Sequence, residues 1–310
     1  MQSNLAIAIP TYNRSEILKF NLESILEELI KFNIPVYISD DSTENNTELL
    51  IKEFKSKHGL FYYRKNEVRF GHDLNCVNTI TFAKEKYVWY LGDSMIIEPG
   101  SIEHVLKCIE NEDFDFICCN AEGRDLNVES SIFTDKIEIF KNLCWHLTLT
   151  GATIYNKEKL VGLLNFDISK FKNFPQTAII FEQLVNKKSN LYWINKNLVR
   201  NNPNKTSYWA SNVFNVFLED LSSFVFNLPE EYPLLSKIKV VRDHSLKTGI
   251  FSYFSFVNYR IEGHYDYKTF LKYRKKIKRF TQSKIYILAI IALFPKGILK
   301  YIRNLYTVEP

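Results

Sequence analysis

Glycine and proline are scarce in this sequence, which holds ten and nine of them among 310 residues. That leaves no room for a long low-complexity linker, and no internal repeat of solenoid period is visible in the sequence. Hydrophobic residues make up 46% of the chain and charged residues 24%, so the chain is expected to fold. Its length predicts one large domain, or a domain of about 200 residues with a smaller addition.

The five cysteines lack any CxxC or cysteine–histidine spacing that would indicate a metal site. Cys118 and Cys119 are adjacent within an apolar run, while Cys76, Cys108 and Cys144 are scattered. Because free cysteine is among the most buried residue types, this distribution predicts buried thiols. A disulfide framework or a zinc site is not expected.

The first residues, MQSNLAIAIP, have no basic start, no long apolar segment and no small-residue cleavage site. They predict no signal peptide, so we expect the body of the protein to stay in the cytosol. Two common phosphate-binding loops are also missing, because no GxGxxG follows a predicted strand and no GxxxxGK[ST] occurs. A bound nucleotide would have to be held in another way.

Short β-rich runs alternate with stretches of helical period in the first 120 residues. This alternation is typical of βαβ units and of a mainly parallel sheet flanked by helices. The predicted strands are 5–9, 35–39, 60–64, 87–91 and 114–119, and the predicted helices contain residues 18–30, 49–54, 74–81 and 102–109. Asn13 followed by Glu16 resembles a helix start. We therefore expect four βα units.

Polar residues follow three of the predicted strands, where an open parallel sheet binds its ligands. These segments are Pro10-Thr11-Tyr12-Asn13-Arg14, Asp40-Asp41-Ser42-Thr43 and Gly92-Asp93-Ser94. Each alone is also typical of ordinary turns and helix caps. Three of them in register favour a ligand site.

These segments resemble the motifs of family 2 glycosyltransferases. Residues 9–14, IPTYNR, are similar to the opening motif of that family, and residues 40–47, DDSTENNT, to its second motif. The stretch Asn66 to Asn75 resembles the segment before the fourth strand, and residues 87–94, YVWYLGDS, the strand that ends in the DxD motif. The order and spacing match over about residues 4–120.

The resemblance implies a GT-A fold, which is a Rossmann-like α/β fold, and a nucleoside-diphosphate sugar as donor, transferred with inversion. It implies that Pro10, Thr11, Tyr12 and Arg14 line the nucleotide pocket together with Asp41, Asn75 and Ser94. Asp40 is expected to accept a hydrogen bond from the base, most plausibly uracil. Asp93 is expected beside the ribose, the diphosphate and a divalent metal such as Mn²⁺ or Mg²⁺.

Two positions depart from the pattern of the family. Met95 stands where the last acid of the DxD motif is usual, and a thioether is a poor ligand for a hard cation, so weak or dispensable metal use is expected. The acidic pair that supplies the base is replaced by residues 174–178, FPQTA. Glu182, His146 and, less favoured, Asp167 are the candidate bases, although each is more typical of a structural role.

Residues 201–207 form a polar loop with Arg200 and Lys205, either closing over a diphosphate or serving as an ordinary surface loop. Beyond it the sequence turns helical and aromatic. We predict a glycosyltransferase domain over 1–207, with a nucleotide-binding half 1–120 and an acceptor half 121–207. The predicted helical C-terminal region is 208–310.

A basic and apolar tail occupies residues 268–310. Seven basic residues and no acid lie between Lys268 and Arg279, and the uncharged stretch Ile285 to Phe294 follows directly. Ten residues are too few to span a bilayer, which takes about 20. The pattern favours a helix attached to the surface of an anionic membrane, and the alternative is a helix docked on the catalytic domain. No nucleic-acid module accompanies the basic cluster, so nucleic acid is not expected as a partner.

The sequence thus predicts an enzyme that transfers a sugar from a UDP-sugar to a lipid-linked glycan during synthesis of capsule, O-antigen or a related surface polysaccharide. We expect it at the cytoplasmic face of the cell membrane. The alternative is a family member that binds a nucleotide sugar or glycan without catalysis, which Met95 and the missing acidic pair would explain. A nucleotidyltransferase is less favoured, because a glycine-rich basic loop is missing after the first strand.

Overall fold

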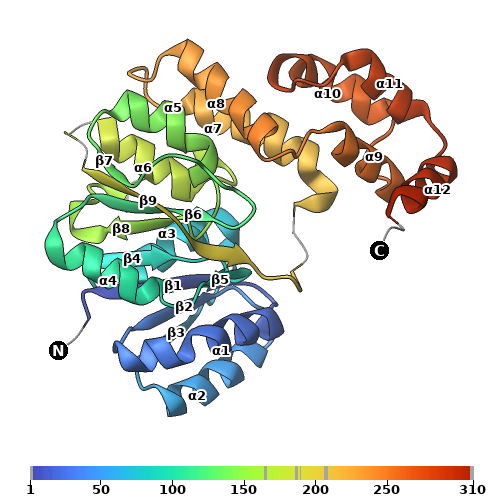
Figure 1. The fold of residues 1–310 in the computed structure, drawn as a ribbon. Coiled ribbons are helices and arrows are strands. Elements are labelled where there is room, and N and C mark those ends of the chain that lie inside the picture. Colours follow the sequence, from blue (N-terminus) through green and yellow to red (C-terminus); the bar gives the residue numbers. More distant parts are fainter. Residues whose placement is uncertain (1–2, 164–165, 186–187, 189, 206–208, 308–310) are drawn as a thin grey trace. The chain divides into compact units, whose positions relative to one another are not determined.

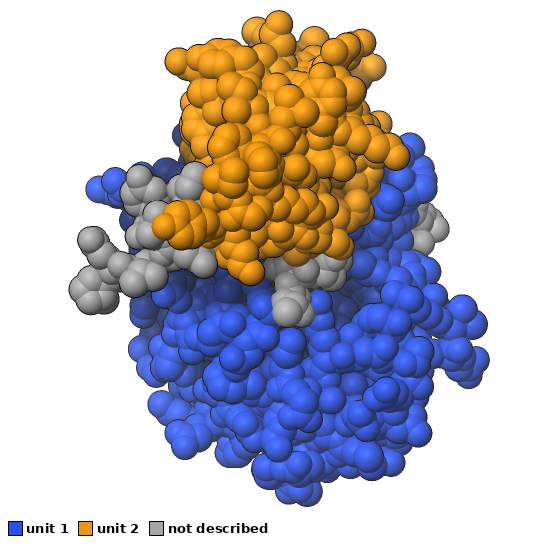
Figure 2. Space-filling model, turned by 90° about the vertical axis from the view of Figure 1, so that its right-hand side faces the viewer, with its two compact units in different colours: residues 1–206 blue, residues 207–310 orange. Residues whose placement is uncertain are grey.

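The computed structural model describes residues 3–163, 166–185, 188, 190–205 and 209–307. Its contacts divide the chain into two compact units, residues 1–206 and 207–310 (Figure 2). The predicted domain boundary at residue 207 lies outside the described residues.

The first unit is a sheet flanked by helices (Figure 1). Its strands are β1 (Leu5–Thr11), β2 (Val36–Asp40), β3 (Phe61–Lys65), β4 (Tyr87–Tyr90), β5 (Met95–Ile97), β6 (Phe116–Ala121), β7 (Ser131–Phe133), β8 (Thr153–Asn156) and β9 (Leu191–Asn201). Its helices are α1 (Ser15–Lys31), α2 (Asn46–Lys57), α3 (Gly71–Phe82), α4 (Ser101–Asn111), α5 (Lys136–Leu147) and α6 (Pro175–Val185), with short 3₁₀ turns η1 (Lys157–Lys159) and η3 (Ile168–Phe171).

The nine strands form one mixed sheet in the order β3-β2-β1-β4-β8-β6-β9-β5, and β7 also pairs with β9. Strands β3, β2, β1 and β4 are parallel. Strand β8 runs antiparallel between β4 and β6, while β9 is parallel to β6. The carboxyl ends of β1, β2, β3 and β4 therefore share one edge of the sheet, which we call the carboxyl edge.

Strand β1 shows why these residues form a central strand. Leu5, Ile7 and Ile9 are fully buried in a core with α1, α2 and α4, while Ala6 and Ala8 belong to a second cluster on the α3 side. A strand covered on both faces reads as a continuous apolar run. The small alanines let α3 lie close to the sheet.

Two local predictions need correction. The α1 helix begins at Ser15 with Arg14 as its N-cap residue, and Asn13 does not cap it. Asn13 has φ 51° and its side-chain oxygen accepts hydrogen bonds from Thr43 of the neighbouring loop. In addition, β5 stands between β4 and α4, because the chain after Asp93 pairs antiparallel with the end of β9.

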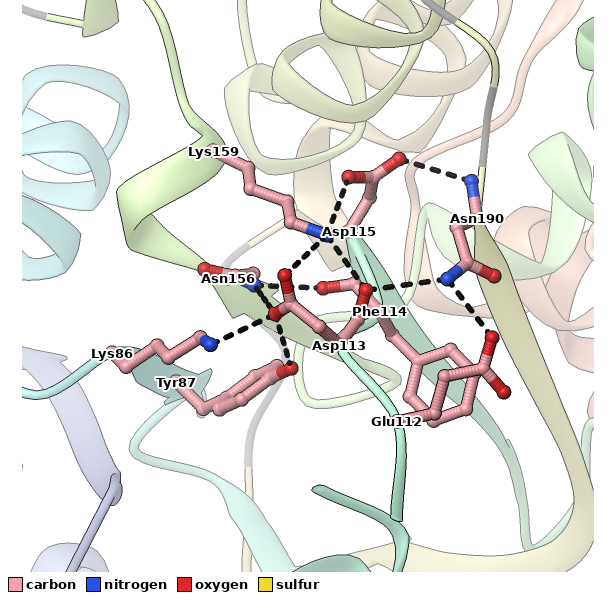
Figure 3. A network of polar contacts seen from close by, with 9 residues as sticks. All are labelled: Lys86, Tyr87, Glu112, Asp113, Phe114, Asp115, Asn156, Lys159 and Asn190. Carbon is pink, nitrogen blue, oxygen red and sulfur yellow. Dashed lines mark hydrogen bonds and ion pairs between the residues drawn. The ribbon is translucent and has the colours of Figure 1, made fainter. Parts of the chain in front are cut away.

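The opposite edge of the sheet, where β4, β6 and β9 begin, holds a polar network that we call the amino-edge network (Figure 3). Asp113 lies 2.9 Å from both Lys86 Nζ and Lys159 Nζ and accepts a hydrogen bond from Asn156 Nδ2 at 2.8 Å. Burial would raise the pKa of Asp113, but the hydrogen bonds and charges of the two lysines outweigh it and hold that pKa well below its ordinary value. Asp115 accepts from the Asn190 amide at 3.0 Å, which ties β6 to β9.

The second unit is helical. It contains η4 (Ala210–Asn212), the π-helical η5 (Asn215–Asp220), α7 (Leu221–Asn227), α8 (Leu234–Lys247), α9 (Tyr253–Glu262), α10 (Tyr267–Phe280), α11 (Ile285–Leu293) and α12 (Lys296–Thr307). Its core is aromatic, because the Phe214 ring contacts the rings of Phe251, Phe256, Tyr259, Tyr265 and Tyr273. No helix in the described part of the chain combines the length and the apolar character that crossing a bilayer requires.

Candidate functional site

The three polar segments predicted from the sequence meet at the carboxyl edge. Thr11 at the end of β1 lies beside Asp40 at the end of β2 in the strand register. The amide of Leu91, at the end of β4, donates to the Ala8 carbonyl, so the turn that carries Asp93 starts next to β1. Residues 83 positions apart in sequence, Ala8 and Leu91, are thus brought into hydrogen-bond distance.

Asp93 is the centre of this cluster. Its Oδ2 accepts a hydrogen bond from Thr11 Oγ1 at 3.2 Å, and its Oδ1 forms an ion pair with Arg14 at 3.2 Å. Burial raises the pKa of the Asp93 carboxyl, and the charge of Arg14, the hydrogen bonds and the charge of His72 oppose this only in part. Such a carboxylate at a sheet edge is typical of a functional site.

Asp40 is fully buried and serves the fold as well as the predicted pocket. Its Oδ1 accepts from the Ser42 amide at 2.8 Å, and its Oδ2 accepts from the Tyr63 hydroxyl at 2.8 Å. Burial and the neighbouring Asp40 raise the pKa of Tyr63 well above its ordinary value, so this hydroxyl remains a donor. The Asp40 carboxylate is thereby fixed in position.

Asp41 and Asn75 were predicted to line the nucleotide pocket, and the structure gives both of them supporting contacts. Asp41 accepts hydrogen bonds from the Asn66 side chain at 2.7 Å and from the backbone amide of Gly71 at 2.8 Å. Asn75 is only 3% exposed, and its amide oxygen accepts from Ser39 Oγ at 2.7 Å. In this conformation both residues hold loops of the carboxyl edge in place.

The remaining predicted pocket residues lie on the outer side of the cluster. Tyr12 is exposed, and the guanidinium of Arg69 lies 4.0 Å from the centre of its ring. Pro10 is partly buried beside it in β1, and Ser94 is partly buried in the turn after Asp93. The Ser94 carbonyl accepts from the Asn202 amide at 3.0 Å, which joins this turn to the end of β9.

Lys205 brings further positive charge to Asp93. Its pKa is lowered, first by burial and then by the charges of Arg124 and Arg14, while Asp93 acts in the opposite direction. Lys205 comes from the loop that was predicted to close over a diphosphate, of which residues 206 and 207 lie outside the described residues. Three basic side chains whose charges repel one another are suited to a multiply charged anion.

Two buried asparagines in this cluster were missed. Asn21 of α1 donates its side-chain amide to the Asp93 carbonyl, and Asn202 donates to Asn21 Oδ1 at 2.9 Å. Asn21 lies next to Leu22 and three residues after Leu18 on the buried side of α1. A side-chain amide on an apolar helix face predicts a buried polar partner, so the position of Asn21 in the sequence could have identified it as part of this cluster.

The residues around Asp93 do not fit a divalent metal centre of the type that the family resemblance implies. Both Asp93 oxygens are bonded to Thr11 and Arg14, and the nearby charges are cationic. Met95 is 1% exposed and belongs to the apolar core, so its side chain does not accompany Asp93. No cluster of three or more potential His, Cys, Asp or Glu ligands exists among the described residues.

The candidate bases lie in different surroundings. His146 is fully buried at the end of α5 between the rings of Trp145 and Trp193, so it cannot contact an acceptor in this conformation. Glu182 is partly buried in the third turn of α6. Asp167 is exposed and pairs with Lys170 at 3.2 Å. Each of the three remains a prediction as the catalytic base.

An α/β sheet of this topology, with carboxylates and basic side chains gathered at its carboxyl edge, is typical of domains that bind nucleotides at that edge. The model of the family described as glycosyl transferase family 2 matches residues 6–162, which is just over half of the chain. The chain belongs to this family, as its motifs predicted.

Two curated relatives are 25% identical to the chain over their aligned parts. The abequosyltransferase RfbV of Salmonella typhimurium is 25% identical over 219 residues, which are 63% of this chain and 65% of the relative. The poly(ribitol-phosphate) beta-N-acetylglucosaminyltransferase TarP of Staphylococcus aureus is 25% identical over 203 residues, which are 60% of this chain and 58% of the relative. The matched part is thus less than two thirds of each relative.

Solved structures share the fold. Residues 1–349 of TarS from S. aureus in complex with UDP match with a TM-score of 0.58 and 14% identity, over 98% of this chain and 87% of that one. The mannosyltransferase PcManGT from Pyrobaculum calidifontis, in complex with GDP-Man and Mn²⁺, matches with a TM-score of 0.57 and 11% identity, over 100% of this chain and 89% of that one. These matches confirm the predicted GT-A-like α/β architecture.

Proposed function

We propose that this protein is an inverting glycosyltransferase that moves a sugar from a UDP-sugar to a lipid-linked glycan in the synthesis of a surface polysaccharide. The observation that carries the proposal is the meeting of Asp40, Asp93 and Arg14 at the carboxyl edge of a family 2 fold. The S. aureus TarS structures with UDP and UDP-GlcNAc support a uridine nucleotide as donor. The likeness to an abequosyltransferase supports an O-antigen or a related glycan as product.

The proposed reaction forms a bond between an acceptor hydroxyl oxygen and the anomeric carbon. The bond from that carbon to the β-phosphate oxygen breaks, and the electron pair leaves with UDP. Negative charge therefore develops on the diphosphate, and Arg14 and Lys205 are placed to stabilise it. By the family resemblance, Asp40 is proposed to accept a hydrogen bond from uracil, which requires a movement that exposes its buried carboxylate.

Metal dependence is proposed to be weak, because Met95 lies in the core and basic side chains surround Asp93.

Release of UDP tests both the transfer and its metal dependence, when a panel of UDP-sugars is incubated with the protein in the presence and absence of EDTA. We expect release with at least one sugar and a less than tenfold loss in EDTA. Complete loss in EDTA with rescue by micromolar Mn²⁺ would contradict weak metal dependence. Tight UDP binding without turnover of any donor or added glycan acceptor would favour the non-catalytic alternative.

The second unit is proposed to attach the enzyme peripherally to an anionic membrane on the cytoplasmic side. Helix α10 buries Phe270, Tyr273, Ile277 and Phe280 within the unit and leaves most of its basic residues exposed. The next helix, α11, exposes Tyr286, Ile290 and Leu293 by 58–63%. Exposed basic residues contribute on the order of 1 kcal/mol each at an anionic surface, and apolar side chains add to this.

Vesicle flotation tests the membrane proposal with the full chain. Replacing Lys268, Lys275 and Lys278 by glutamate should abolish flotation with vesicles of mixed neutral and anionic lipid, because the exposed charge of α10 is reversed. The matched control replaces the exposed Lys55, Lys84 and Lys141 of the first unit and should float like the unchanged protein. Flotation that is equal in both variants, or that is absent from the unchanged protein, contradicts the assignment.

A further inference from the structure

The end of the segment between β3 and α3 is held at the carboxyl edge by Asp41. Asp41 accepts hydrogen bonds from the backbone amides of Phe70 at 3.2 Å and Gly71 at 2.8 Å. Gly71 has φ 75°, a left-handed conformation that favours glycine at this turn. The next residue, His72, therefore stands at the start of α3 in a defined position beside the proposed donor site.

His72 and Asp73 form a hydrogen-bonded pair. His72 Nδ1 lies 2.8 Å from Asp73 Oδ1, and because the carboxylate accepts, Nδ1 carries the proton. The ring is then the tautomer whose basic lone pair is on Nε2. Their side chains are 35% and 23% exposed, so both can be reached from solvent.

The same carboxylate reaches the place where the family usually has its acidic pair. Asp73 Oδ1 accepts a hydrogen bond at 3.0 Å from the backbone amide of Asn173, two residues before Pro175 at the start of α6. Asn173 has φ 66°, which is uncommon for a residue with a side chain. Residues 174–178 have no carboxylate, so Asp73 brings one to this helix start from α3.

Other groups of the carboxyl edge are less suited to accept a proton. Asp41 already accepts three hydrogen bonds that hold the loop, and Asp93 forms an ion pair with Arg14. His146 is fully buried. His72, by contrast, is 35% exposed in its side chain and lies in the neighbourhood of Asp93.

We infer that His72 is the general base of the transfer and that Asp73 is its positioning residue. His72 Nε2 takes the proton of the acceptor hydroxyl while that oxygen bonds to the anomeric carbon and UDP leaves with the electron pair. Asp73 holds the ring by its hydrogen bond to Nδ1 and stabilises the imidazolium that forms, which is the role of the carboxylate in other His–Asp pairs. The inference rests on the proposed inverting transfer.

The test compares His72→Asn, whose amide can still donate to Asp73, with the matched control His104→Asn on α4. With the UDP-sugar that the unchanged protein hydrolyses, we expect kcat to fall about 100-fold or more in the first variant and to stay within twofold in the control. UDP affinity, measured by calorimetry, and thermal unfolding should match the unchanged protein in both. A kcat of His72→Asn above half of the original overturns the inference.

Two further variants distinguish proton transfer from packing. Added imidazole should restore part of the rate of His72→Ala, and Asp73→Asn, which can still accept from the Asn173 amide, should lower kcat rather than raise KM. Absence of rescue together with an unchanged kcat of Asp73→Asn contradicts the role of His72. If the unchanged protein neither binds UDP nor releases it from any UDP-sugar, the proposed function fails instead, and the inference with it.

Discussion

The two edges of the same sheet use aspartate and basic side chains in opposite ways. At the amino edge, Asp113 is more than half exposed, yet two lysines lower its pKa. At the carboxyl edge, Asp93 is buried and its pKa is raised despite its ion pair with Arg14. The lysines more than offset the burial of Asp113, whereas the basic neighbours of Asp93 offset its burial only in part, and carboxylates of the second kind gather at functional sites.

The largest effect is expected on activity, which should depend on Asp93 and not on Asp113. Asp93→Asn should lower kcat/KM for UDP-sugar hydrolysis by about 100-fold or more, because the ion pair that orients Arg14 is lost. Its Tm at pH 7 should be no lower than that of the unchanged protein. A raised pKa means that the ionised carboxylate lowers stability once the pH exceeds about 3.9, the ordinary value for aspartate, and Asn removes that effect. A large fall in Tm would show that Asp93 serves the fold.

A smaller effect is expected from the lysines of the two edges. Lys205→Gln should weaken UDP binding about 10- to 100-fold, because charged hydrogen bonds to the diphosphate are lost. Lys159→Gln in the amino-edge network removes a comparable charge and should leave the affinity for UDP unchanged. Isothermal titration calorimetry measures the UDP affinity of both variants. An equal loss of affinity in the two would contradict the assignment of UDP binding to the carboxyl edge.

The smallest effect concerns the stability that the amino-edge network provides. Asp113→Asn should destabilise the fold at pH 7 by about 1 kcal/mol, lowering Tm by about 2–4 °C, with UDP affinity intact. The pKa of Asp113 is lowered in the folded state, so its contribution is present above pH about 3.9 and is lost as the pH falls further. Thermal unfolding between pH 7 and pH 3 should therefore show the two proteins converging. A constant difference would mean that packing, not charge, is lost.

Much of the fold could be predicted because the central strands are buried on both faces. The predicted strands at 5–9 and 35–39 fall within β1 and β2 to within two residues, since a continuous apolar run is a strong signal. Strand β5 gave no such signal, because its three residues become a strand only by pairing with β9. The π-helical η5 of the second unit has no marker in sequence either.

The residues that gather at the carboxyl edge could be predicted, but the contacts that they make there could not. Asp40 and Asp93 follow strands, so their place at the carboxyl edge could be derived from the order of the elements. Two contacts could not be predicted, namely that of Asp41 with the Gly71 amide and that of Asp73 with the Asn173 amide. Both depend on the paths of loops, which no local sequence pattern encodes. The pair of His72 and Asp73 was overlooked because neighbours in sequence rarely face one another in a helix.

Strand β9 connects the amino-edge network to the turn that carries Asp93 at the carboxyl edge. It follows Asn190, whose amide binds Asp115 in the amino-edge network, and after its last residue Asn202 binds the Ser94 carbonyl beside Asp93. On the far side, the turn that carries Asp93 is closed by the three residue pairs of β5 with β9 and by the hydrogen bond of the Asn202 amide to Ser94. Amide hydrogen exchange at Met95 and Ile97 should consequently report how often this turn opens, and a ligand that binds Asp93 should slow that exchange along the end of β9 as well.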